Sequence, residues 1–265
     1  MTEIYQYPVE WYQFTKVSFQ LRSASQTSPR PWAGGNSIYG PHVQMWMPKL
    51  TVSTQDVDTW PAMDAFFSRL GGQAGLIRIG DVSRLDTQYN RSLAASASYW
   101  TDGTSFTDGS GFLSGLLPPV CYVVASASRG DKYIIMGGLP ASIPRALRRG
   151  DLFELRPNGI PSATPNLYQI MVDAATNTSG MAGVEIRPPL RMGFAVGDVV
   201  ILKNPTSVFH LIDDSQAEMS ITAPMLADFG FSLIEAIENV RGPSGTGTAS
   251  FVAPSAHPTY FFLGF

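Results

Sequence analysis

Residues 58–81 constrain the fold most, because they join a helical pattern directly to a short strand. Apolar residues recur every three to four positions in the first half, which places them on one stripe of a helix. The residues of this stripe are Trp60, Met63, Phe66, Phe67 and Leu70. Gly71 and Gly72 suit the left-handed conformation that ends a helix. Residues 76–79 are then typical of a strand, closed by a Gly-Asp turn. The stretch predicts one helix that covers a β domain.

The segments on either side of this stretch predict strands and loops. Residues 14–22 alternate between apolar and polar side chains, as a half-buried strand does. Residues 23–40 are rich in Ser, Gly, Pro and Asn, which indicates a long loop. Residues 43–52 form a second strand pattern, in which Pro48 marks an edge or a bulge.

The composition changes after residue 88. Residues 89–117 are rich in Ser, Ala, Gly and Thr, with two Asp-Gly turns, and predict a connector that holds at most a small hairpin. Short apolar runs then follow at the spacing of a small barrel or sandwich, often behind a Gly-Asp pair. These runs are residues 120–125, 133–136, 152–155, 167–172, 184–186 and 199–202.

Three later runs, residues 207–212, 218–222 and 231–237, are typical of strands that return to the first domain. The pattern as a whole predicts a mainly β protein. We assign residues 1–88 and 203–265 to one domain, residues 89–117 to the connector, and residues 118–202 to an inserted β-barrel-like domain.

Composition and charge exclude several classes of function. Only 15% of residues are charged and the net charge is −3, while 44% are hydrophobic, which favours burial against partners. The acidic balance and the absence of a basic run argue against sequence-specific nucleic-acid binding. No apolar run could span a bilayer, and residues 1–11 do not resemble a signal peptide. The single cysteine, Cys121, lies in an apolar run and is expected to be a buried thiol in a reducing cytoplasm.

No motif predicts a catalytic residue, a cofactor or a metal ion. The histidines His42, His210 and His257 lack a second ligand at metal spacing. The residues needed for a phosphate-binding loop or a nucleophile elbow are missing. Asp213 and Asp214 are adjacent, so on a strand end they point in opposite directions and make poor acid–base partners. We therefore expect a protein that is not an enzyme.

Two stretches taken together resemble the distal tail protein family of long-tailed bacteriophages, related prophages and gene-transfer agents. The first runs from residue 65 to residue 81, and the second comprises residues 186–191, 197–200 and 204–211. The similarity extends to residues 17–22 and 230–233, and covers most of residues 14–86 and 148–238. Val82 departs from the proline expected after the Gly-Asp turn, which puts only the rigidity of that turn in doubt.

The resemblance implies a structural protein of the virion, made in the cytoplasm of the bacterial host. Family members form a hexameric ring at the tail tip, between the tail tube protein and the baseplate hub protein. The family's ring-forming domain is a β-sandwich with one α-helix. Its second, barrel-like domain lies outside and contacts fibres, receptor-binding proteins or saccharides. For this chain we therefore expect a homo-oligomeric ring with no cofactor, and no contact with a membrane.

Two groups of aromatic residues lie outside these patterns. Tyr99 and Trp100 in the connector are candidates for a glycan or partner contact, since flat rings stack on sugars. They motivate an alternative function as a carbohydrate-binding module or a tail-associated glycan hydrolase, although a hairpin or subunit contact explains them better, since aromatic residues are enriched at interfaces. Residues 242–265 predict an arm that docks on a neighbouring protomer or on the hub. Its apolar residues are Tyr260, Phe261, Phe262, Leu263 and Phe265.

Overall fold

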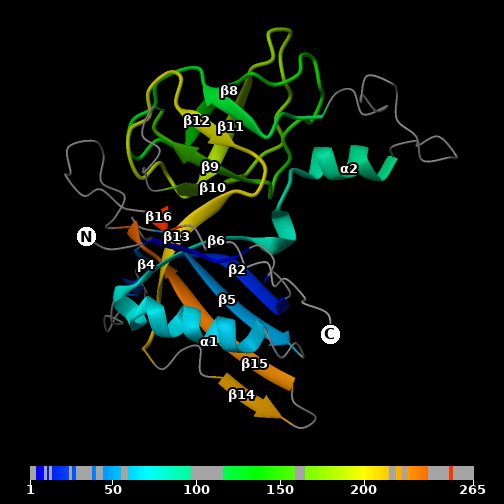
Figure 1. Ribbon diagram of the computed structural model, residues 1–265. Coiled ribbons are helices and arrows are strands. Elements are labelled where there is room, and N and C mark those ends of the chain that lie inside the picture. The colour runs from blue at the N-terminus through cyan, green and yellow to red at the C-terminus, as the bar shows by residue number, and fades with distance from the viewer. Residues whose placement is uncertain are drawn as a thin grey trace, which may run out of the picture.

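The computed structural model confirms a mainly β protein made of an open sheet and a closed barrel (Figure 1). The structure describes residues 4–8, 11, 14–23, 26–27, 38–39, 44–54, 59–96, 116–158, 165–214, 219–222, 226–237 and 251–252. The sheet is built from both ends of the chain, and the barrel from its middle. The barrel lies against one end of the sheet, as Figure 1 shows.

The open sheet is mixed and has eight strands. Its order is β16 (Phe251–Val252), β1 (Ile4–Gln6), β6 (Leu76–Gly80), β13 (Thr206–Leu211), β15 (Leu226–Glu235), β5 (Gln44–Thr54) and β2 (Phe14–Ser23), with β14 (Met219–Thr222) also paired to β15. A separate hairpin joins β3 (Gln26–Thr27) to β4 (Ile38–Tyr39). The other described strands of this part therefore form one continuous sheet, where the family resemblance implied a sandwich. Pro48 lies just beyond the last β5–β15 pair, so its missing N–H removes no bond to β15.

Helix α1 (Thr59–Leu70) covers the apolar face of this sheet. Met63, Phe67 and Leu70 are buried, and Trp60 and Phe66 pack half-buried against the same core. Gly71 follows with a φ of 72°, as expected for a glycine that ends a helix.

A short 3-10 turn, η2 (Gly72–Ala74), then sends the chain back into β6. A Cβ on Gly75 would lie 2.1 Å from the Leu70 carbonyl oxygen, so this reversal requires glycine.

The barrel has six strands, each antiparallel to both neighbours. In order around the barrel they are β10 (Asn166–Ile170), β11 (Ala182–Arg187), β8 (Tyr133–Gly137), β7 (Val120–Val123), β12 (Val199–Ile201) and β9 (Leu152–Arg156). All six apolar runs predicted between residues 120 and 202 therefore form strands. Their inward side chains make a separate core that includes Phe153, Tyr168 and Ile186.

Three barrel strands begin behind the same Gly-Asp turn. Gly130, Gly150 and Gly197 have φ values of 94°, 94° and 90°, which favour glycine. Each following aspartate accepts a hydrogen bond from the backbone N–H three residues before it, at 2.7, 3.0 and 2.8 Å. The repeated pair is thus a self-contained turn that starts β8, β9 and β12.

The structure adds a second helix, α2 (Gln88–Ser96), at the start of the predicted connector. Thr87 begins it, since its hydroxyl accepts a hydrogen bond from the Asn90 N–H at 3.2 Å. The Asn90 amide bonds both backbone groups of Leu117, at 2.7 and 3.1 Å. This contact fixes the start of the barrel beside the end of the sheet.

Candidate functional site

The structure brings together some of the predicted site residues and leaves others outside its described part. The five helix residues lie in one apolar core with β2, β5, β13 and β15. The connector aromatics Tyr99 and Trp100 lie outside the described residues, as do Tyr260, Phe261, Phe262, Leu263 and Phe265. Of the predicted arm, only Phe251–Val252 is described, and it pairs in parallel with β1 of its own chain. The site must therefore be sought elsewhere.

A buried polar cluster lies where the barrel meets the sheet. Glu154 on β9 has no exposed surface, and the N–H and hydroxyl of Thr206 on β13 both donate to its Oε2 at 2.8 Å. Two guanidinium groups neutralise this carboxylate. Arg78 on β6 lies 3.6 Å from it, and Arg156 on its own strand also pairs with it. The sheet and the barrel are therefore joined through one buried carboxylate.

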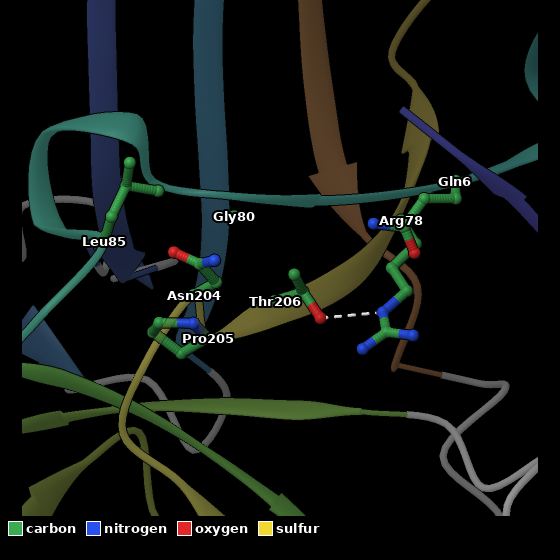
Figure 2. A pocket seen from close by; sticks show the side chains of 7 residues that line it. All are labelled: Gln6, Arg78, Gly80, Leu85, Asn204, Pro205 and Thr206. Carbon is green, nitrogen blue, oxygen red and sulfur yellow. Dashed lines mark hydrogen bonds between the residues drawn. The ribbon is translucent and has the colours of Figure 1, made fainter. Parts of the chain in front are cut away.

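A small pocket of about 160 Å³ opens beside this cluster, and Figure 2 shows the side chains that line it. Arg78 reaches across it to donate from Nε to the Thr206 hydroxyl at 2.7 Å. Asn204, with a φ of 53°, turns the chain from the barrel into β13. The pocket is large enough to hold water. The Arg78 guanidinium already has Glu154 and Thr206 as partners, so it is not placed to bind an anion there.

A second ion pair crosses the same junction. Arg191, which follows β11 of the barrel, donates to Glu235 on β15 at 2.5 Å. The Trp46 backbone N–H also donates to Glu235, at 3.1 Å. The indole of Trp46 donates in turn to the Leu167 carbonyl on β10 at 3.0 Å. Leu152 and Leu167 of the barrel belong to the apolar core of the sheet. The barrel is thus held by shared core as well as by polar contacts.

Burial controls the protonation of both junction carboxylates. Loss of solvent raises the pKa of Glu154 to about 7, although Arg78 and Thr206 act in the opposite direction. Burial also raises the pKa of Glu235, against the lowering effect of Arg191. Neither group can reach a substrate, because both are nearly inaccessible. Their chemistry is that of structural contacts.

The barrel presents two tyrosines on strands that do not face the sheet. Tyr122 on β7 is 49% exposed and Tyr133 on β8 is 56% exposed, with Val120 beside them at 50%. Glycines lie beneath both side chains: a Cβ on Gly138 would lie 2.8 Å from the Tyr122 ring, and one on Gly183 would lie 2.0 Å from the Tyr133 hydroxyl. Figure 1 shows β9 and β10 nearer the sheet and β8 on the far side. Both tyrosines are therefore accessible to solvent in the single chain.

The remaining chemistry within the described ranges is sparse. Those residues contain no cluster of His, Cys, Asp and Glu that could hold a metal ion. None of the described helices is long and apolar enough to cross a membrane. Cys121 is buried, which raises the pKa of its thiol to about 12. His210 is half-buried, with Nδ1 3.0 Å from the Gln73 carbonyl oxygen, as a structural histidine would be.

Comparison with known proteins shows no family for this chain. No protein-family model matches it. A search of curated proteins also finds no match.

Sequence reasoning missed the junction for a physical reason. Glu154 occurs in a strand run that alternates poorly, and its partner Thr206 lies 52 positions later. Tyr122 and Tyr133 are apolar residues within ordinary strand patterns, and only closure of the barrel turns them outward. A glutamate inside a short apolar run was the one available signal for a buried ion pair.

Proposed function

We propose that this protein is an architectural component of a bacteriophage tail tip, where it forms a homo-oligomeric ring between the tail tube and the baseplate hub. One observation carries the proposal. The two stretches with the family resemblance form adjacent antiparallel strands, and β6 pairs with β13 from Thr206 opposite Gly80 to Phe209 opposite Ile77. Segments more than a hundred residues apart thus make one structural unit, and α1 covers the sheet that contains it.

The mainly β fold, with a helix over the sheet and a barrel beside it, also supports this proposal, since the resemblance implied a β domain with one helix and a second, barrel-like domain. The ring is the property to test. Mass photometry of the purified chain should find a particle of six times 28.7 kDa, and negative-stain images should show a ring. A protein that stays monomeric at micromolar concentration, alone and with tail tube protein, would contradict the proposal.

A second candidate function is carbohydrate binding by the barrel, favoured by the exposed Tyr122 and Tyr133. Tyrosine rings supported from below by glycine offer flat apolar faces on which a sugar ring can stack. A glycan array should then give a signal that Tyr122→Ala and Tyr133→Ala each abolish. Met171→Ala and Val172→Ala remove comparable exposed apolar surface at 40% and 55% exposure, and serve as controls. Release of reducing sugar from a bound glycan would point to a hydrolase instead.

A further inference from the structure

Cationic side chains gather where α2 meets the turn before β9. They form a cationic band that consists of Arg91, Arg148, Arg149 and Lys203. Three of them are exposed, and Arg148 is half-buried. The chain as a whole has a net charge of −3, so this surface differs in sign from the average of the molecule.

Hydrogen bonds attach the turn before β9 to α2. Arg148 donates from Nη2 to the Ser92 hydroxyl on α2 at 3.3 Å. The Gln88 side chain, one turn earlier on α2, donates to the Arg149 carbonyl at 2.9 Å. Arg91 and Lys203 line a groove beside α2, which Asp86 also lines. Arg148 and Arg149 thus lie against α2, and Arg91 and Lys203 line the groove beside the same helix.

These charges have no ion-pair partner within the described part of the chain, where the ion pairs use other arginines. The nearby carboxylates already have partners within the chain. Asp173 pairs with Arg145 and accepts from the Arg149 N–H at 2.9 Å. Asp86 accepts from the Thr87 N–H and the Asn90 amide, at 2.7 and 3.0 Å. Asp151 is buried and accepts from the N–H groups of Gln88 and Arg148, at 2.9 and 3.0 Å. The band can thus pair with carboxylates from outside.

The groove beside the band has a volume of about 460 Å³, and its floor is apolar. Leu116, Leu117, Pro118 and Pro119 form this floor, and Leu116 is 38% exposed. Asp86 and Asn90 also line the groove, and their side chains are hydrogen-bonded to each other. A volume of this size accepts one or two side chains of a ligand. Cations at the side of an apolar floor favour a ligand that combines negative charge with an apolar group.

We propose that the cationic band and its groove bind an acidic segment of a partner protein, with an apolar side chain of that segment seated in the groove. Arginine suits this partner, because its planar guanidinium can hold a carboxylate with two parallel hydrogen bonds. Single-stranded nucleic acid fits less well, since its bases need exposed aromatic rings and the floor offers leucine and proline. The inference rests on charge and shape alone and does not require the proposed ring.

The test measures binding of a fluorescein-labelled peptide, DEDLEDLDED, by fluorescence anisotropy at moderate ionic strength. The variant Arg91→Glu/Arg149→Glu should bind at least about tenfold more weakly than the parent protein. The matched control is Lys16→Glu/Lys49→Glu, which changes the net charge equally at exposed positions of β2 and β5. It should retain affinity within about threefold. Thermal melts check that both variants fold.

Three outcomes would overturn the inference. Equal losses in the two variants would show that only the total charge matters. Tighter binding of a thymidine oligonucleotide, lost in the band variant, would assign the surface to nucleic acid. Absence of peptide binding by the parent protein at millimolar concentration would leave the band without this ligand. None of these results depends on oligomeric mass. Failure of the ring proposal can therefore be distinguished from failure of the peptide-binding proposal.

Discussion

At the scale of single residues, the aromatic side chains beneath α1 make the first prediction. Phe67 is 9% exposed, and its ring lies 5.0 Å from that of Phe231 and 6.4 Å from that of Phe229. Phe67→Ala should lower the free energy of unfolding by about 3–5 kcal/mol, because it leaves a cavity in the core. The exposed neighbour Ser68 should tolerate alanine within about 0.5 kcal/mol. Chemical denaturation measures both, and the reverse order would show that the helix faces another way.

Glu154 makes a prediction about pH. Its pKa in the folded protein is raised to about 7, so the fold holds this proton more tightly than the unfolded chain does. The resulting stabilisation is complete below about pH 4.5 and is lost as the pH rises through 7. Its size is on the order of 3 kcal/mol.

Melting temperatures between pH 5 and pH 8 provide the measurement for Glu154. The parent protein should lose more stability across this range than Glu154→Gln, which cannot titrate at that position. Identical slopes for the two proteins would mean that Arg78 and Arg156 keep the carboxylate ionised throughout.

Residue-level reasoning from sequence succeeds where the cause is local. The spacing of Met63, Phe67 and Leu70 is enough to predict a buried stripe, because a helix repeats every 3.6 residues. The same reasoning fails for Glu154, since its environment consists of residues brought together by strand pairing. The sequence likewise does not predict the exposure of Tyr122, because that exposure depends on which strands of the barrel face the sheet.

At the scale of elements, the attachment of the barrel to the sheet is the feature to test. Arg191→Met should lower stability by about 3–5 kcal/mol, because it leaves the buried Glu235 carboxylate without its cation. The double variant Arg191→Met/Glu235→Leu should be less damaging than the sum of the single variants, since it removes both charges together. A double-mutant cycle by urea denaturation gives the coupling. Strict additivity would mean that the pair contributes nothing to the junction.

A truncation gives a second test of the junction. The sequence predicts residues 118–202 as an inserted domain, and the structure places two of its residues, Leu152 and Leu167, in the core of the sheet. We expect the excised barrel to melt well below the full chain, because it exposes these leucines and separates Glu154 from Thr206. Calorimetry of both proteins checks this. Equal melting temperatures would restore the barrel as an independent module.

Helices and strands were predicted correctly from the sequence where the local signal was strong. The Gly-Asp pairs ending at Asp131, Asp151 and Asp198 mark strand starts because each turn is closed by its own side chain. Helix α2 escaped notice because its sequence QYNRSLAAS has few apolar residues, and Asn90 anchors it through a residue 27 positions away. The pairing of β6 with β13 could be guessed only through the family resemblance.

At the scale of the whole molecule, the C-terminal region bears on assembly. β16 already pairs with β1, with Ile4 opposite Phe251, and thus lies at an edge of the sheet. Deleting residues 254–265 removes most of the predicted arm beyond this strand. We expect the oligomer measured by light scattering to become smaller, because apolar segments gain most when they dock across a repeated subunit contact. An unchanged mass together with an unchanged melting temperature would refute docking between protomers.

The two chain crossings between sheet and barrel lie side by side. The N–H groups of Leu202 and Lys203 both donate to the Pro119 carbonyl, at 2.8 and 3.4 Å. Because the chain leaves and re-enters the sheet at one place, a gene rearrangement could replace this barrel with another without changing the strands of the sheet. Not every barrel would fit, because Thr206 and Glu235 belong to the sheet and would remain in the protein. A replacement barrel would need a carboxylate to accept from Thr206 and a guanidinium to pair with Glu235. Evolution could therefore replace this barrel only with one that makes both contacts.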